Sequence, residues 1–207
     1  MSFFVREKGK LMCKFSEDSR QKLGNAVIYI ANHTEQLSKT KLLKLLFLME
    51  EYMVKRYHVP FMGLPFEIWQ AGPVAKDIFI DLSDGPFLLK DFVKTEVQKD
   101  ATYIRAIKPF CDDEFADCEM EMMDEIIRKY GKKTAKQLVA EVHKEGSLWF
   151  NAAKKHGLLT AFNKGLCNNS DYTIDFSEEL SDCAREDYKE SLAIHQTANI
   201  LKAQGHV

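Results

Sequence analysis

Two neighbouring stretches decide the fold of this chain: TKLLKLLFLMEEY at residues 40–52 and FEIWQAGPV at residues 66–74. In the first stretch, apolar side chains from Leu42 to Met49 occupy every side of a 3.6-residue period, interrupted only by Lys44. A helix at a protein surface keeps one polar side, so this pattern predicts a helix that is enclosed by protein. We expect it to be the central element of one core.

The second stretch predicts an extended segment followed by the start of a helix. Residues 64–69 are mostly apolar or aromatic, and Gly72 and Pro73 follow them. Proline is well placed at the first position of a helix, because the N–H that it lacks would have no partner there. We therefore predict a helix from Pro73 to about Leu82.

Polar capping residues mark the starts of other helices. Segments with helical periodicity follow Ser16 or Ser19, Ser38, Thr134 and Ser147, whose hydroxyl groups can accept from the unpaired amides of a first turn. Gly131 and Gly157 are typical helix stops. The expected helices span residues 16–33, 38–57, 73–82, 112–131, 134–143, 147–157 and 178–202.

Two short segments predict a small β element. FVKTEV at residues 92–97 and ATYIRAI at 101–107 are rich in β-branched and aromatic side chains and flank Lys99-Asp100. Residues 172–176 could add a strand. The predicted fold class is therefore mainly α, at most α+β: a helical bundle around a buried central helix, with a small β-hairpin and a long C-terminal helix. Residues 1–157 would form the domain and 158–207 an extension packed on it or on a partner.

The composition excludes several classes of protein. With 29 basic and 31 acidic side chains, the formal charge is -2, which gives no general attraction to nucleic acid or to an anionic membrane. The longest apolar run is far shorter than the ~20 residues of a membrane span. Five widely spaced cysteines favour reduced thiols. We expect a soluble, cytoplasmic protein without membrane contact and with little tendency to bind nucleic acid.

The two stretches also resemble the motifs of a known family. Thr40, Lys41, Leu42, Lys44, Leu45 and Phe47 are followed by Gly63, Glu67, Trp69, Gly72, Pro73 and Val74, and later by His143 and Trp149. This order resembles the Panacea domain of SocA-like and phage-associated GepA-type antitoxins, with phenylalanine at position 47 where tyrosine is common. The resemblance covers roughly residues 20–157.

The resemblance implies an antitoxin-like protein that neutralises a cognate toxin, or another phage or bacterial effector, by protein–protein contact. Its SocA branch implies delivery of the toxin to an ATP-dependent protease. No catalytic residue, metal or cofactor is expected. The motif residues, expected to be structural or partner-binding, are Thr40, Lys41, Lys44, Glu67, Trp69, Gly72, Pro73, Val74, His143 and Trp149.

Lys44 lies inside the apolar helix and would need a partner, because an unpaired buried ammonium group is costly. The resemblance suggests Glu67, in a pair that organises the fold rather than catalyses. Trp69 and Trp149 are either core residues or part of a recognition surface; burial is the more common state of large aromatic side chains.

Two other functions stay open. A DNA-binding regulator would need a basic helix face and salt-sensitive binding. An enzyme would need a site assembled by the fold, for which His143, Glu67 and Cys118 are candidates. Cys111 and Cys118 lack the spacing of a zinc site. The acidic run from Asp112 to Glu125 is either a solvated face or a surface for a basic partner.

The C-terminal extension has an apolar stripe at helical spacing. The tail after Gly157, particularly its charged helix around residues 182–195, could set specificity for a toxin. It could equally form a homodimer through the stripe, or the stripe could pack within the protein; the stripe residues are Leu192, Ile194, Ala198 and Leu201. The sequence leaves these three alternatives open.

Overall fold

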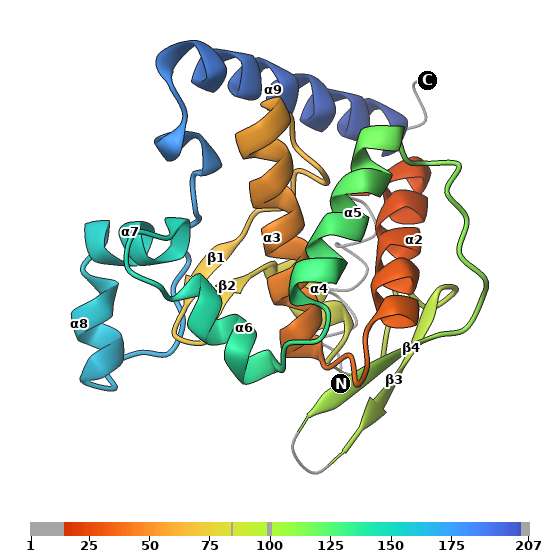
Figure 1. Cartoon of the computed structure of the whole chain (residues 1–207), viewed down its shortest axis with the longest axis horizontal. Coiled ribbons are helices and arrows are strands. Elements are labelled where there is room, and N and C mark those ends of the chain that lie inside the picture. The colour runs from red at the N-terminus through yellow and green to blue at the C-terminus, as the bar shows by residue number, and fades with distance from the viewer. Residues whose placement is uncertain (1–14, 84, 99–100, 204–207) are drawn as a thin grey trace.

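The structure is a computed structural model that describes residues 15–83, 85–98 and 101–203. The predicted turn at Lys99-Asp100 lies outside these residues. Helix α3 (Lys39–Tyr57) runs through the middle of the molecule, with α2 (Glu17–His33) and α5 (Asp117–Tyr130) beside it (Figure 1). Every side chain from Lys41 to Glu50 is buried, which confirms the prediction of an enclosed central helix.

The predicted caps hold the starts of four helices. The hydroxyl group of Ser38 accepts the amide of Lys41 at 3.3 Å, and the side chains of Ser16, Thr134 and Ser147 cap in the same way. Thr134 precedes α6 (Ala135–Val142), and Ser147 precedes α7 (Leu148–Lys155). Near the C-terminus, the long helix α9 (Asp182–Ala203) crosses one end of α3 (Figure 1). The short helix α8 (Leu158–Asn163) and the 3-10 turn η1 (Phe176–Glu179) were not predicted.

Helix α5 begins at Asp117, five residues later than the predicted start at Asp112. Ala116 is extended, and the carboxylate of Glu119 accepts its amide at 3.1 Å, so the N-terminus is fixed at this point. The acidic residues at 112–114 therefore precede the helix and do not form its first turn.

Gly72 and Pro73 do not start a helix, so this prediction was wrong. Residues Gly72–Val74 form strand β2, which pairs antiparallel with β1 (Glu67–Trp69), and Ile68 lies opposite Pro73. The chain reverses at residues 70–71, and Gly72, which follows this turn, has φ +94°, a conformation that glycine adopts without strain. Helix α4 (Lys76–Asp81) begins only after the ribbon ends.

A segment of the C-terminal extension lies along the free edge of β1. The amide of Ile68 donates to the carbonyl oxygen of Tyr172 at 2.9 Å, and that of Ile174 donates to Phe66 at 2.8 Å. The ring of Phe176 then packs against Phe66, with ring centroids 6.0 Å apart. The predicted strand at 172–176 is thus represented by a single bridge between Thr173 and Glu67, and the extension packs within the molecule.

The predicted hairpin is present as β3 (Val93–Val97) and β4 (Thr102–Ala106). Strand β4 is attached to the bundle because the amide of Ile104 donates to the carbonyl oxygen of Leu37 at 2.8 Å. The fold is mainly α, as predicted, and the described residues form two small antiparallel ribbons where one hairpin was expected. Among the described residues, no helix is both long and apolar enough to cross a lipid bilayer.

Candidate functional site

Lys44 joins the central helix to the β1–β2 ribbon. Its side chain is 1% exposed, and its Nζ atom donates to the carbonyl oxygen of Pro73 at 2.7 Å. Burial lowers the pKa of Lys44 to about 7. A Cβ atom at Gly72 would lie 2.8 Å from Cε of Lys44, so the absence of a side chain there makes room for the lysine. These motif residues therefore form one packed contact.

Glu67 does not pair with Lys44, contrary to the prediction. Its carboxylate accepts the indole N–H of Trp69 at 2.8 Å and lies 3.3 Å from Nζ of Lys76. Successive side chains of a strand point to opposite faces, and only Ile68 of β1 is fully buried. Glu67 and Trp69 therefore share the outer face of the ribbon, whereas Lys44 approaches from the bundle.

His143 and Trp149 stack beside this contact. Their rings are 3.8 Å apart and nearly parallel, and the indole N–H of Trp149 donates to the backbone oxygen of Trp69 at 3.1 Å. Burial, with a contribution from the charge of Lys44, lowers the pKa of His143 to about 4. Its Nε2 atom is buried and has no hydrogen-bond partner among the described residues. The imidazole is therefore neutral at physiological pH and acts as a packing element.

The remaining motif residues lie at the start of α3 and in β2. Lys41 is buried and donates to the backbone oxygen of Gly131 at 2.7 Å, at the C-terminal end of α5. Carbonyl groups at a helix C-terminus carry partial negative charge, so this end of α5 is a favourable site for an ammonium group. Thr40 is half-buried, and Val74 is buried beneath the ribbon.

Two buried carboxylates that the sequence analysis did not single out hold the loops around the bundle. Glu50 accepts the backbone amides of residues 61–63 at 2.9–3.2 Å, and Asp81 accepts those of residues 87–89. Burial raises the pKa of Glu50 to about 7, opposed by those three hydrogen bonds. The signal available in the sequence was a charged residue within an apolar helix. Glu50 shows this signal as clearly as Lys44 does.

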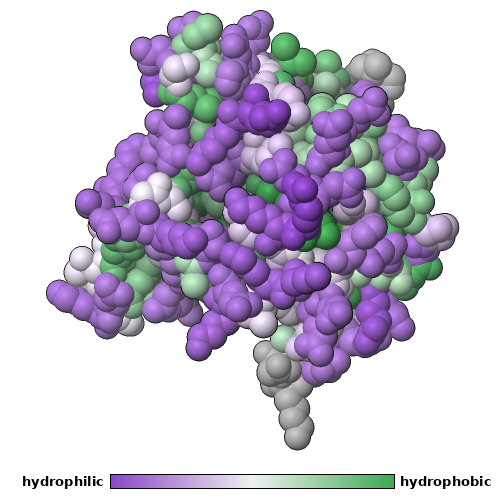
Figure 2. Space-filling model, in the orientation of Figure 1, coloured by the Kyte–Doolittle hydropathy of each residue, from purple (hydrophilic) through white to green (hydrophobic). Residues whose placement is uncertain are grey.

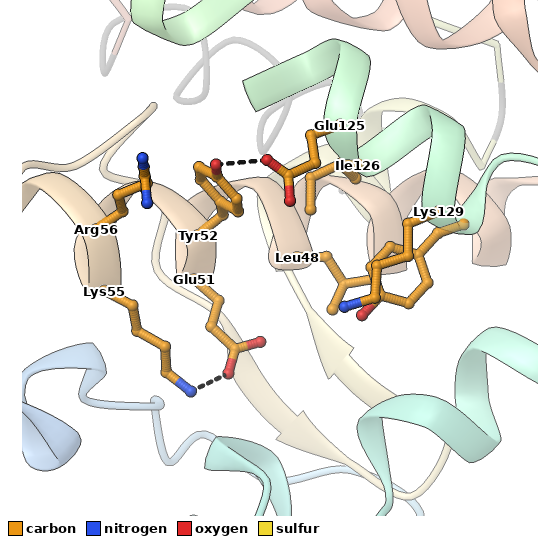
Figure 3. A pocket seen from close by; sticks show the side chains of 9 residues that line it. Leu48, Glu51, Tyr52, Lys55, Arg56, Glu125, Ile126 and Lys129 are labelled. Carbon is orange, nitrogen blue, oxygen red and sulfur yellow. Dashed lines mark hydrogen bonds and ion pairs between the residues drawn. The ribbon is translucent and has the colours of Figure 1, made fainter. Parts of the chain in front are cut away.

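A surface groove of 540 Å³ lies between α3 and α5 (Figure 3). Leu48 and Ile126 form part of its apolar floor, together with the rings of Tyr52 and Tyr130. The hydroxyl group of Tyr52 donates to Glu125 at 2.7 Å, which bridges the two helices. The groove thus combines apolar area with polar groups on two rigid elements, as binding sites commonly do.

Of the basic side chains at the rim of this groove, one forms ion pairs and two do not. Lys55 forms ion pairs with Glu51 at 2.8 Å and with Glu179 of the extension at 2.7 Å. Arg56 and Lys129 are exposed, and neither forms an ion pair with a carboxylate in the described part of the chain. The rim therefore offers two cations, one on each helix, to a molecule bound in the groove.

The residues considered for catalysis or metal binding are not assembled into one site. Glu67 bonds to Trp69 and Lys76 and His143 stacks on Trp149, while no hydrogen bond or ion pair of the described residues joins either to Cys118. Cys111, Asp112 and Asp113 bring possible metal ligands within 4.8 Å of one another, but all three are exposed. This cluster provides no enclosed coordination site.

The apolar stripe predicted on α9 is divided between two faces. Leu192 is partly buried against the core, next to the buried Tyr188, whereas Ile194, Ala198 and Leu201 are exposed. Most of this stripe is therefore not used in packing within the described molecule.

The fold is a helical bundle in which buried packing contacts support the two helices that border the groove. Residues 42–150, more than half of the 207 residues, match the family described as antitoxin SocA-like, Panacea domain. The chain belongs to this family, as the motifs predicted. No curated protein and no solved structure shows significant similarity to the chain.

Proposed function

We propose that this protein is an antitoxin that binds a cognate toxin or effector protein and neutralises it by direct contact. The family match supports the class of function, because the family is named for its antitoxins. The matched residues include most of α3 and all of α5, the two helices that line the groove. This overlap is the observation that carries the proposal, and it makes the groove our candidate contact surface.

The chemistry of the groove indicates the kind of toxin segment that it fits. Aromatic and apolar side chains at the centre of an interface contribute much of the binding energy, and a polar rim excludes water. Tyr52 and Leu48 supply such a centre, while Arg56 and Lys129 favour an acidic partner. We infer that the toxin inserts an apolar or aromatic side chain flanked by carboxylates.

In this proposal the motif residues act as support and do not touch the toxin. Lys44 is enclosed by the ribbon, and Trp149 is 3% exposed. Lys44 holds α3 against the β1–β2 ribbon and Trp149 bonds to the same ribbon, so these contacts support α3, whose outer residues then present the groove. The face seen in Figure 2 is mostly hydrophilic, with small apolar areas between charged side chains, so contact through a confined groove suits this surface.

The test is co-expression with the product of the neighbouring gene, with a growth assay and an affinity pull-down. The wild type is expected to bind that protein and to restore growth. Arg56→Glu/Lys129→Glu should lose both properties, because the cations become anions. Lys164→Glu/Lys189→Glu makes the same change of charge at exposed positions outside the groove and should retain both.

The same assay separates two modes of neutralisation. If the toxin is occluded, growth is restored while the amount of toxin is unchanged. If the toxin is delivered to an ATP-dependent protease, its half-life shortens in the presence of the antitoxin. The absence of both complex and rescue, together with salt-sensitive DNA binding, would contradict the proposal and favour a regulator.

A further inference from the structure

Strand β3 has an open outer edge. In an antiparallel pair, residues alternate between those that exchange hydrogen bonds with the partner strand and those that do not. The amide of Ile107 donates to the carbonyl oxygen of Phe92 at 3.0 Å, and the amide of Gln98 donates to that of Ala101 at 2.9 Å. Residues 92 and 98 are therefore hydrogen-bonded to the partner strand, and every second residue between them is as well. Residues 94 and 96 therefore bond to β4, whereas the backbone groups of Thr95 and Val97 point away from it.

One backbone amide of this edge is already satisfied. The N–H group of Val93 donates to the carbonyl oxygen of Leu89 at 3.0 Å, within the turn that leads into the strand. The carbonyl group of Val93 and both backbone groups of Thr95 and Val97 face outward. Within residues 15–83, 85–98 and 101–203, no strand pairs with this edge.

The sequence of β3 is self-complementary. Its five residues read Val-Lys-Thr-Glu-Val, so an antiparallel copy centred on Thr95 places each valine opposite a valine. The same register places Lys94 of each copy opposite Glu96 of the other. Opposite charges at facing positions stabilise a pair of strands, and like charges destabilise it.

We propose that two copies of this protein associate through β3, in an antiparallel pairing centred on Thr95. Thr95 exchanges two backbone hydrogen bonds with Thr95 of the second copy, and the contact is centred there because the carbonyl oxygen of Leu89 already occupies the outer amide of Val93 at each end. The two hairpins then form a four-stranded sheet. This interface is separate from the α3–α5 groove, so the dimer presents two grooves.

The exposure of β3 fits this pairing. Val97 is 78% exposed, whereas Val93 at the other end of the strand is 1% exposed. In the dimer, each Val97 lies beside the Val93 of the other copy, on the same face of the sheet. Lys94 already lies 3.4 Å from Glu96 of its own strand, and Arg105 bonds to the same carboxylate at 2.8 Å. The facing copy brings a second lysine to each Glu96.

Charged side chains on an edge strand can also prevent pairing with another strand. The experiment therefore tests whether Lys94 and Glu96 promote dimerisation or prevent it. Five residues give a small interface, so association should be weak and concentration-dependent. Sedimentation equilibrium of the full chain over a wide concentration range is expected to show reversible dimers. Lys94→Glu and Glu96→Lys should each weaken dimerisation at least tenfold, because like charges then face each other.

An equimolar mixture of the two variants provides the sharpest control. It should form heterodimers about as well as the wild type forms homodimers, because positions 94 and 96 are both acidic in one chain and both basic in the other. Thr95→Pro removes the central outward N–H without removing a bond to β4, and should give a folded monomer. Lys90→Glu, at an exposed position before the strand, should dimerise normally.

Two results would overturn the proposal. The first is a monomer at every concentration. The second is a dimer that resists Lys94→Glu and Thr95→Pro but is broken by Ile194→Asp, which would assign association to the exposed stripe of α9. Circular dichroism verifies that each variant is folded. Since the test uses this chain alone, its failure would leave the proposed toxin contact unaffected.

Discussion

The two ribbons of this protein differ in how their edges are treated. Strands β1 and β2 have three residues each, yet their free edge is covered by residues 168–174 and a buried lysine lies beneath them. Strands β3 and β4 have five residues each, and no strand of the described residues pairs with the outer edge of β3. The comparison indicates that enclosure, and not strand length, makes a short ribbon part of the core. Each of the following substitutions alters one of the two ribbons or the residues that cover it.

The largest effect is expected at the cover of the first ribbon. Phe176 is 4% exposed, and its ring centroid lies 5.4 Å from that of Phe47. Phe176→Ala should lower the free energy of unfolding by about 3–5 kcal/mol, since it removes apolar contacts and leaves a cavity. Urea denaturation measures this change. Phe87→Ala, at a phenylalanine that is 40% exposed, is the matched control and should cost much less.

The second prediction concerns the lysine under the same ribbon. The pKa of Lys44 is about 7 in the folded protein and 10.5 in an ordinary lysine, because burial disfavours the charge. Between these values the unfolded chain binds a proton that the folded chain lacks, so Lys44 makes stability increase with pH across this window. Lys44→Met should remove an increase of roughly 3–4 kcal/mol between pH 7 and 10.

This effect is measured as the difference between the wild-type and Lys44→Met stabilities at several pH values from 7 to 10. Other groups that titrate in the range cancel in the difference. Parallel profiles for the two proteins would mean that Lys44 keeps an ordinary pKa and is not enclosed by the ribbon. The two ribbons would then not differ by a buried lysine of lowered pKa beneath one of them.

The smallest effect is expected on the open hairpin. Val97→Ser should change the unfolding free energy of the dilute protein by no more than about 0.5 kcal/mol, because an exposed side chain loses few contacts. The same substitution at Val74, which is 3% exposed in β2, should cost several times as much. Thermal denaturation at low protein concentration compares the two. Equal losses would show that the ribbons are enclosed alike.

Local signals made much of the fold predictable from the sequence. Ser16, Ser38, Thr134 and Ser147 cap the helices that follow them, because a cap depends on residues within one turn. The enclosed position of α3 followed from its uniform apolar surface. The family motifs predicted the family, and the structure brings two of their residues, Lys44 and Pro73, into contact.

Contacts between distant residues could not be predicted. Pro73 suits both the first turn of a helix and a two-stranded ribbon, and its pairing with Ile68 decides the outcome. Lys44 bonds to a backbone oxygen instead of Glu67, which no pattern of side chains reveals. The groove depends on the packing of α5 against α3, which brings Tyr52 to Glu125 across 73 residues of sequence.

The strand-like segment at 168–174 also bears on how this protein can exchange parts with its relatives. The recognisable family segment ends at residue 150, yet β1 receives its outer hydrogen bonds from beyond that point. A recombination event that joined residues 42–150 to another C-terminus would leave Ile68 and Phe66 without those partners. The heritable unit is therefore expected to extend at least through η1, beyond the segment by which the family is recognised.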